Sequence, residues 1–335
     1  MAKKKKLILL SASIICALLI IAGACICCLH IHRKNSWHFD IKDTLPDGNG
    51  QRATVILLGG QSNAAGCSRD DYLKQNASAE KYAEYQNGYD NVYINYYVTG
   101  TNESHGFVKC TTKQGEAGGC FGPELGLAEK LHERYPDETF FIIKCTWSGT
   151  DLFNQWLSPT SEGRKGPLYK CKQWLFSSNK KVAGSLYRGF TAYVGTGIEY
   201  LASKGYDVQI AGMCWMQGES DSLSLENAKG YATHLTNFIA DIRKEFAHCA
   251  AKDGIAFVDA YIADNPTYWV FCDEVNASKK QVADSSPMNV LIDTVGAGLS
   301  CDEEPADNPD LAHYDSMSEI KLGHLFAEAL VPFLD

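Results

Sequence analysis

The chain has 335 residues, and its 31 basic and 40 acidic side chains give a formal net charge of −9. Residues 1–34 contain six basic side chains and no acid, so they carry +6 and the rest of the chain carries −15. A domain this acidic lacks the basic face that nucleic acid requires. The hydrophobic fraction of 45%, with 11% aromatic residues, is too high for intrinsic disorder. These values exclude a nucleic-acid-binding protein and a disordered scaffold.

The first predicted element is an uncharged stretch, residues 7–29, that follows four consecutive lysines. As a helix it would be about 34 Å long, enough to cross the roughly 30 Å hydrocarbon core of a membrane. It is either an uncleaved anchor or a signal peptide cleaved at the A-x-A pattern of residues 22–24. We favour the anchor, because the apolar stretch continues beyond that pattern.

The charges on either side of this stretch predict its orientation. Four lysines precede it, whereas only Arg33 and Lys34 follow it closely, so the positive-inside rule places the N-terminus in the cytoplasm. The sequence therefore predicts a cytoplasmic tip and transmembrane anchor over residues 1–34, a linker over 35–52, and a lumenal or extracellular domain over 53–335. Cleavage of the first segment would instead make the protein secreted.

The cysteines predict disulfides rather than a metal site. Nine cysteines follow the apolar stretch, without a C-x-x-C motif and without a histidine at ligand spacing. Outside the cytoplasm we expect some of them to form disulfide bonds, and Cys110 and Cys120 are the nearest pair in sequence. The connectivity stays open.

The folded part alternates short apolar runs with helical patterns. The runs, which are typical of strands buried on both faces, span residues 54–58, 92–98, 139–144, 208–216 and 255–259. Helical periodicity follows Gly122-Pro123-Glu124 and recurs over residues 186–198, 231–246 and 320–330. This alternation predicts one three-layer α/β/α sandwich around a parallel sheet.

Ligands of such sheets bind outside the carboxyl ends of the strands. The first strand is followed by Gly59-Gly60-Gln61-Ser62-Asn63, a tight turn that exposes a serine near the backbone N–H groups of a helix. That placement suits a nucleophile, although a serine in this pattern can also simply cap a helix. The third strand leads into a turn containing Gly149, which can offer another N–H donor.

Two further segments carry candidate site residues. The fourth strand ends in Trp215-Met216-Gln217-Gly218-Glu219-Ser220-Asp221, where the Gln217 amide can donate toward the same sheet edge. We expect Glu219 and Asp221 to hold loops by accepting backbone hydrogen bonds. Near the C-terminus, Asp310 lies three residues before His313, so the carboxylate can orient the imidazole as a base for Ser62.

Together these segments resemble the sialic-acid-specific acetylesterase family, a branch of the SGNH hydrolases that is similar to the acetylxylan esterases of carbohydrate esterase family six. The matching motifs are Gly60-Gln61-Ser62-Asn63, Ser148-Gly149-Thr150, the segment from Trp215 to Asp221, and Asp310-x-x-His313. The resemblance implies an SGNH-hydrolase-like (flavodoxin-like) fold. Family members often have methionine after Gln-Ser-Asn, where this chain has Ala64; this departure leaves the expected triad untouched, but the resemblance does not predict the shape of the acyl pocket.

The resemblance also implies roles for single residues. Ser62 would be the nucleophile, His313 the base and Asp310 its partner. The oxyanion donors would be the backbone N–H groups of Ser62 and Gly149 and the side chain of Gln217. We assign supporting positions around this site to three further residues, Gln61, Asn63 and Glu219.

We therefore expect a carbohydrate O-acetylesterase that needs no metal or organic cofactor. Its partners would be an O-acetylated carbohydrate and, through the N-terminal helix, a membrane. Two alternatives are an inactive glycan-binding protein on a hydrolase scaffold and an SGNH lipid or thioester hydrolase. The presence of Ser62, Asp310, His313 and Gln217 together favours the esterase over the binding protein.

Overall fold

The computed structural model describes residue 18 and residues 20–163 and 165–334. Its main sheet has eight strands, in the order β10-β9-β8-β1-β7-β3-β4, with β5 also paired to β3. The strands of this sheet are β1 (Arg52–Gly60), β3 (Val92–Val98), β4 (Asn102–Glu103), β5 (Val108–Lys109), β7 (Phe140–Thr146), β8 (Asp207–Met216), β9 (Ala256–Ala260) and β10 (Asn289–Ile292). Two short strands, β2 (Ser68–Arg69) and β6 (Cys120–Phe121), form a separate antiparallel pair.

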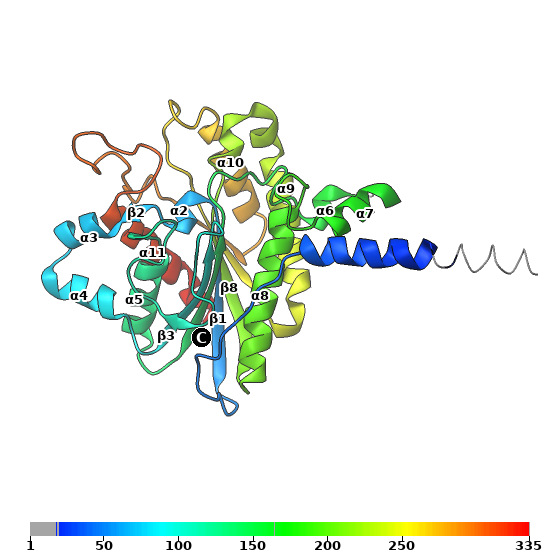
Figure 1. The fold of residues 1–335 in the computed structure, drawn as a ribbon. Coiled ribbons are helices and arrows are strands. Elements are labelled where there is room, and N and C mark those ends of the chain that lie inside the picture. The colour runs from blue at the N-terminus through cyan, green and yellow to red at the C-terminus, as the bar shows by residue number, and fades with distance from the viewer. Residues whose placement is uncertain (1–17, 19, 164, 335) are drawn as a thin grey trace, which may run out of the picture.

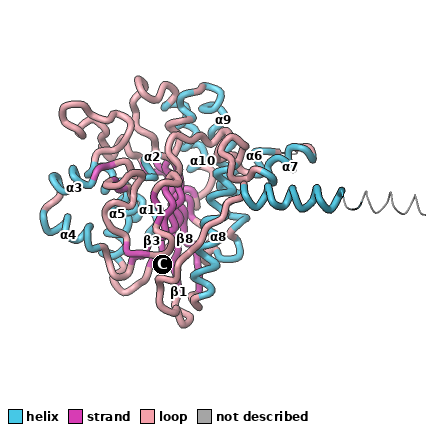
Figure 2. Tube along the Cα trace, viewed as in Figure 1, coloured by secondary structure: helices cyan, strands magenta, loops and turns pink. Residues whose placement is uncertain are grey.

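Helices cover both faces of the sheet (Figure 1). On one face α5 packs against α11, and on the other α8 crosses the central strands while α9 packs against α10. The α-helices are α2 (Ser62–Ala65), α3 (Asp70–Asn76), α4 (Ala79–Asn87), α5 (Glu124–Arg134), α6 (Pro159–Glu162), α7 (Pro167–Leu175), α8 (Ser185–Ser203), α9 (Leu225–Glu245), α10 (Cys272–Ala283) and α11 (Ser316–Leu330). Figure 2 shows the strands forming the middle layer between them. The predicted three-layer α/β/α fold is confirmed.

The five predicted strands correspond to β1, β3, β7, β8 and β9, and each pairs in parallel with its neighbours among them. Apolar side chains buried on both faces gave these strands their sequence signal. Three strands of the main sheet were not predicted. The parallel edge strand β10 is only four residues long and mostly half-buried, and β4 and β5 are antiparallel two-residue strands.

The segment predicted as a linker, residues 35–52, packs along the domain instead of hanging free of it. The Trp37 indole donates to the Ser185 carbonyl at 2.9 Å, and Leu45 is buried. The backbone N–H groups of Thr44 and Leu45 both donate to the Tyr200 hydroxyl. Aromatic and aliphatic residues spaced among polar ones give this segment its contacts with α8.

Most of the predicted membrane span, residues 7–17 and 19, lies outside the described residues. A helix covers residues 20–34 and extends away from the domain (Figure 1). Within the described part of the chain, no helix is both long enough and apolar enough to cross a bilayer. The anchor therefore stays a prediction.

The predicted disulfides are not confirmed. All twelve cysteines in the described ranges are free thiols. Cys110 is buried and its thiol donates to the Glu124 carbonyl at 3.4 Å instead of pairing with Cys120.

A fully buried ion pair joins the sheet to α5. Lys144 on β7 and Glu124 at the start of α5 are both completely inaccessible to solvent, and their charged atoms lie 2.6 Å apart. The Lys144 ammonium also donates to the Gln114 carbonyl, and the second oxygen of Glu124 accepts from the Gly122 N–H at 2.9 Å. These contacts satisfy both buried charges, which would otherwise be strongly destabilising.

Replacing Lys144 by methionine leaves the Glu124 carboxylate buried and uncompensated. We expect Lys144→Met to lower the free energy of unfolding by about 3–5 kcal/mol, measured by urea denaturation. The matched control is Lys130→Met on α5, which removes a partly exposed pair with Glu133 and is expected to cost less than about 1 kcal/mol. Equal losses for the two variants would contradict this interpretation, and Lys144→Met/Glu124→Gln should recover part of the loss.

Candidate active site

Three of the predicted site segments begin at one level of the sheet. Gly60 at the end of β1 pairs with Thr146 at the end of β7 and with Met216 at the end of β8. Backbone hydrogen bonds join the residues that follow: Trp147 N–H donates to the Gly60 carbonyl at 3.1 Å, and Gln61 N–H donates to the Met216 carbonyl at 2.9 Å. The turns carrying Ser62, Gly149 and Gln217 therefore leave the sheet side by side.

Only glycine fits at the end of β1. Gly60 has a φ of +136°, and a Cβ atom there would lie 2.0 Å from the Met216 carbonyl oxygen. This close approach lets the chain turn directly from β1 into α2, whose first residue is Ser62. The expected strand–turn–helix placement of Ser62 is therefore present.

Ser62 does not act as a helix cap. Gln61 occupies the cap position of α2, and no side chain caps this helix. The Ser62 hydroxyl makes no hydrogen bond with the described residues, and neither do the backbone N–H groups of Ser62 and Gly149. Gly149 has a φ of +64° and open space where a Cβ would lie. A free hydroxyl and two unpaired N–H donors thus lie on neighbouring turns at the carboxyl end of the sheet, and no hydrogen bond joins Ser62 to His313.

The structure brings Asp310 and His313 together as the sequence predicted. The imidazole Nδ1 lies 2.7 Å from Asp310 Oδ2, and the Asp310 carboxylate also accepts from the Ala312 N–H at 3.1 Å. The hydrogen bond at Nδ1 leaves Nε2 as the nitrogen available to take a proton. The His313 side chain is 28% exposed, so the imidazole is open to a ligand.

Asn63 ties the serine turn to the histidine loop. Its side-chain oxygen accepts from the Tyr314 N–H at 3.1 Å, and its nitrogen donates to the Ala312 carbonyl at 3.3 Å. Ala312 and Tyr314 are the two neighbours of His313. The same nitrogen donates to Glu219 Oε1 at 2.8 Å. Asn63, the residue after Ser62, therefore holds the loop on which His313 lies. These hydrogen bonds describe how Asn63, predicted as a supporting residue, would support the site.

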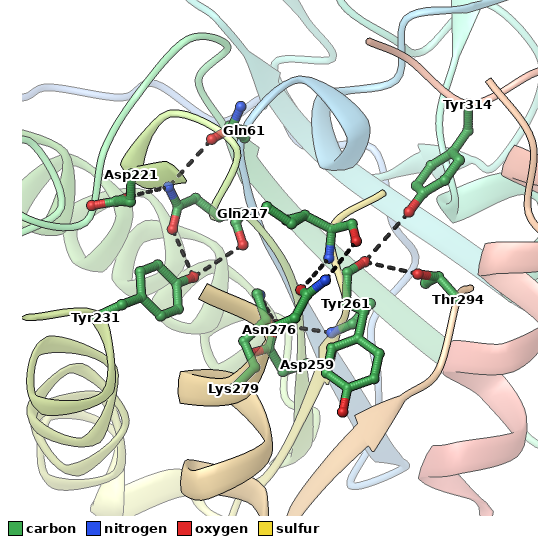
Figure 3. A network of polar contacts seen from close by, with 12 residues as sticks. Gln61, Gln217, Asp221, Tyr231, Asp259, Tyr261, Asn276, Lys279, Thr294 and Tyr314 are labelled. Atoms are coloured by element: carbon green, nitrogen blue, oxygen red, sulfur yellow. Dashed lines mark hydrogen bonds and ion pairs between the residues drawn. The ribbon is translucent and has the colours of Figure 1, made fainter. Parts of the chain in front are cut away.

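Gln217 lies in a buried hydrogen-bond network (Figure 3). Its Nε2 donates to Asp221 at 2.6 Å, to the Thr150 carbonyl at 3.0 Å and to Gln61 Oε1 at 3.2 Å, while its Oε1 accepts from the Tyr231 hydroxyl at 2.9 Å. An amide nitrogen has only two hydrogens. Both are directed at protein acceptors here, so Gln217 can serve as an oxyanion donor only by releasing one of these partners.

Glu219 and Asp221 are almost fully buried near these turns. Asp221 accepts from the Leu152 N–H at 2.8 Å and the Phe153 N–H at 3.2 Å, which confirms that it holds a loop. Burial raises its pKa to about 7, although hydrogen bonds from Leu152 and Gln217 oppose that rise. Burial likewise raises the pKa of Glu219.

Glu116 is a site residue that the sequence analysis missed. Its carboxylate accepts hydrogen bonds from the Ser148 hydroxyl and, at 3.1 Å, from the Cys67 thiol. Burial and the neighbouring Glu116 raise the pKa of Cys67, so this cysteine is a neutral donor. Glu116 thus connects the end of the Ser62 turn to the Gly149 turn. It lies in a glycine-rich loop with neither strand nor helix periodicity, so no pattern in the sequence indicated it.

A groove and a small acidic group lie close to this site. The groove has a volume of about 430 Å³ and includes Leu311 and Tyr314 on either side of His313, together with Asp264 and Asn265. Among the described residues, Asp264, Cys272 and Asp273 have potential metal-ligand atoms within 4.8 Å of one another. Within the described residues, these three side chains form no hydrogen bond with Ser62, Asp310 or His313.

The raised pKa of Asp221 predicts how stability depends on pH. Its folded value of about 7 exceeds the ordinary 3.8, so from about pH 4 to 7 the folded chain holds a proton that the unfolded chain has lost. The stability advantage of the wild type over Asp221→Asn should therefore fall across this range, by up to about 1.4 kcal/mol per pH unit. Urea denaturation at pH 5 and pH 8 measures it. Glu245→Gln, at an exposed carboxylate of α9, is the control and should show no such trend; a constant difference for Asp221→Asn would be inconsistent with a raised pKa.

Comparison with known protein families gives a match over most of the chain. Residues 52–332 match the family described as carbohydrate esterase, sialic acid-specific acetylesterase. No match was found among curated protein sequences.

Solved structures share the fold at low sequence identity. NanS is 15% identical with a TM-score of 0.60, covering 87% of this chain and 98% of its own. A protein from Arabidopsis thaliana is 17% identical with a TM-score of 0.55, covering 86% and 99%. A carbohydrate acetylesterase from Xanthomonas citri is 16% identical with a TM-score of 0.55, covering 84% of this chain and 56% of its own.

The family match spans most of the chain, and the predicted resemblance is confirmed. The chain belongs to the carbohydrate esterase family of sialic acid-specific acetylesterases, and it is a hydrolase of carboxylic esters.

Proposed function

We propose that this protein removes acetyl groups from O-acetylated glycans through a triad of Ser62, His313 and Asp310. The observation that carries the proposal is the 2.7 Å contact between His313 Nδ1 and Asp310, on a loop that Asn63 fixes beside Ser62. Family membership supports carbohydrate O-acetylesterase activity. The roles of the single residues are the part that we propose.

The reaction would proceed in two displacement steps. Ser62 Oγ attacks the acetyl carbonyl while His313 Nε2 takes the serine proton, and Asp310 stabilises the imidazolium that forms. The tetrahedral intermediate collapses when the C–O bond to the sugar breaks and His313 returns the proton to the departing sugar oxygen. Water then attacks the acetyl-enzyme, again giving its proton to His313, and acetate leaves while the proton returns to Ser62.

The oxyanion of each intermediate needs fixed donors. The backbone N–H groups of Ser62 and Gly149 are unpaired among the described residues and can supply two of them. Gln217 is the third proposed donor. It would have to exchange one of its three present acceptors for the oxyanion, and the carbonyl of Thr150 and the side chain of Gln61 are the more distant of the three.

The charges next to His313 favour a neutral sugar over an anionic one. Residues 301–312 contain five acidic side chains and no basic one: Asp302, Glu303, Glu304, Asp307 and Asp310. Of these, Glu304 is held by Ser316 and Asn76, whereas Asp302, Glu303 and Asp307 form no ion pair among the described residues. A carboxylate on the substrate would meet a negative potential there. We therefore propose that neutral acetylated glycans are preferred over sialylated ones.

Ser62→Ala should abolish acetate release from an O-acetylated glycan, because no other nucleophile stands at the turn. Acetate release is measured for the wild type and for Ser62→Ala, which tests the role of Ser62. Comparing the wild type on acetylated xylan and on O-acetyl sialic acid tests the substrate preference. A fluorophosphonate probe should label the wild type and not Ser62→Ala, with Ser148→Ala as the control that keeps its label. Undiminished hydrolysis by Ser62→Ala would refute the triad, and release from the sialic acid substrate alone would refute the preference for neutral sugars.

The N-terminal segment supports a further proposal, a single-pass anchor with a cytoplasmic N-terminus and a lumenal or extracellular esterase domain. Residues 7–29 carry no charge, and four lysines precede them. The full chain in membranes should resist carbonate extraction, and protease added from the cytoplasmic side should leave the domain intact.

Charges placed in the middle of this stretch should prevent insertion. Each lysine at the centre of a membrane helix costs about 2.5–3.5 kcal/mol, so Ile14→Lys/Leu18→Lys should move the protein to the soluble fraction. Ile14→Ala/Leu18→Ala is the control expected to stay in the membrane. A wild-type chain that is released with its N-terminus at residue 25 would favour the cleaved signal peptide instead.

A further inference from the structure

One segment of this acidic chain is strongly basic. Between Glu162 and Glu199 the sequence holds seven lysine and arginine residues and no acid. All five lysines among them are exposed and form no ion pair within the described ranges: Lys165, Lys170, Lys172, Lys180 and Lys181. They lie on α7 and on the loops at its two ends. We call residues 163–181 the basic segment.

Helix α7, inside the basic segment, turns its apolar face outward. At 100° per residue Leu168, Cys171, Trp174 and Leu175 fall on one face of the helix. Leu168 is 88% exposed and Trp174 is 42% exposed, and no residue of α7 is buried. The opposite face makes the polar contacts, since the Gln173 amide donates to Glu162 and to the Ala183 carbonyl. This arrangement is the reverse of an ordinary surface helix.

The exposed face lies beside the helix of residues 20–34. The rings of His32 and Trp174 stack with centroids 4.2 Å apart, and His32 Nδ1 donates to the Trp174 carbonyl at 2.6 Å. That helix leaves more than half of each large apolar side chain exposed at Ile20, Ile21, Ile26 and Leu29. Both helices project from the same side of the molecule (Figure 1). Exposed apolar surface and unpaired lysines are therefore concentrated in one place.

We propose that the basic segment is a membrane-surface contact: α7 lies against a bilayer containing anionic lipids, with its apolar face at the boundary between headgroups and acyl chains. Leu168 and Trp174 would enter that boundary, where tryptophan is favoured. The lysines would reach lipid phosphates, because their long side chains extend along an apolar surface while the ammonium groups stay in the polar layer.

Two features separate this partner from other candidates. A soluble polyanion would account for the lysines but not for the exposed leucine and tryptophan between them. An apolar protein surface would account for those two residues but not for five unpaired lysines. An anionic bilayer satisfies both, and the neighbouring helix leads toward the predicted anchor. With the esterase domain lumenal or extracellular, the contact requires anionic lipids in the leaflet on that side. With the anchor in place, even a weak surface contact would be occupied because its effective concentration is high.

The contact can be tested in the full chain with vesicles whose acyl chains are brominated and quench tryptophan fluorescence. We expect the wild type to lose more fluorescence than Trp174→Phe in vesicles containing phosphatidylglycerol. The difference between these two proteins isolates Trp174 from the other tryptophans. It should shrink in vesicles of phosphatidylcholine alone, since each lysine near an anionic surface contributes about a fivefold factor in binding.

Charge reversal provides the matched comparison. Lys165→Glu/Lys170→Glu/Lys172→Glu should remove the Trp174-dependent quenching. The control Lys74→Glu/Lys229→Glu/Lys252→Glu changes three exposed lysines outside the basic segment and should keep it. Hydrolysis of a soluble aryl acetate by every variant shows that the domain is folded.

The outcomes also separate this contact from the anchor. If carbonate releases the chain from membranes, the predicted anchor is wrong. Quenching of Trp174 by anionic vesicles in that same chain would still support the surface contact. An active, membrane-inserted protein whose Trp174 is not quenched would overturn the proposal. So would protection of α7 by a sulfated polysaccharide in the absence of any effect of vesicles.

Discussion

Three parallel strands, β1, β7 and β8, end at the same level of the sheet, and the rest of the site depends on this constraint. Gly60, Thr146 and Met216 form one row across β1, β7 and β8, and the chain can turn there only because residue 60 has no side chain to meet the Met216 carbonyl. Segments that are far apart in sequence therefore leave the sheet at the same height. The register of the sheet therefore places a serine hydroxyl and two unpaired backbone donors on neighbouring turns.

Hydrogen bonds between buried polar groups then fix the side chains and loops whose positions the strand register does not determine. Asn63 binds both neighbours of His313 and Glu219, and Gln217 is held by Gln61, Thr150 and Asp221. In an apolar interior each of these groups is costly unless it is paired, so the network has few alternative arrangements. The same hydrogen bonds limit what Gln217 can bind, because both hydrogens of its amide already face protein acceptors. If Gln217 donates to the oxyanion, as proposed, it must give up one of these partners when charge develops on the substrate.

The sequence predicted the central strands because both faces of a central parallel strand are buried, which produces uninterrupted apolar runs. It missed β10 because an edge strand of four half-buried residues has no such run. Apolar periodicity predicted α5, α8, α9 and α11, but α10, which follows β9, was not predicted. Asp310 and His313 could be paired from their spacing, since three residues in a turn bring side chains together. Glu116 could not be found, because its partners Cys67 and Ser148 are close only in the folded chain. The packing of residues 35–45 was missed because its few aromatic residues lack a period.

The net charge of −9 conceals a division between two parts of the molecule. In the described part of the chain, Arg33 and Lys34 lie close to the lysines of the basic segment, because His32 stacks on Trp174. The loop of residues 301–312, which contains Asp310 and precedes His313, carries negative charge. Such a separation creates a dipole across the domain, and a charged membrane surface would align it. The basic segment would be attracted to lipid phosphates while the acidic loop is repelled, so the candidate active site would be turned away from the bilayer and toward substrates outside it.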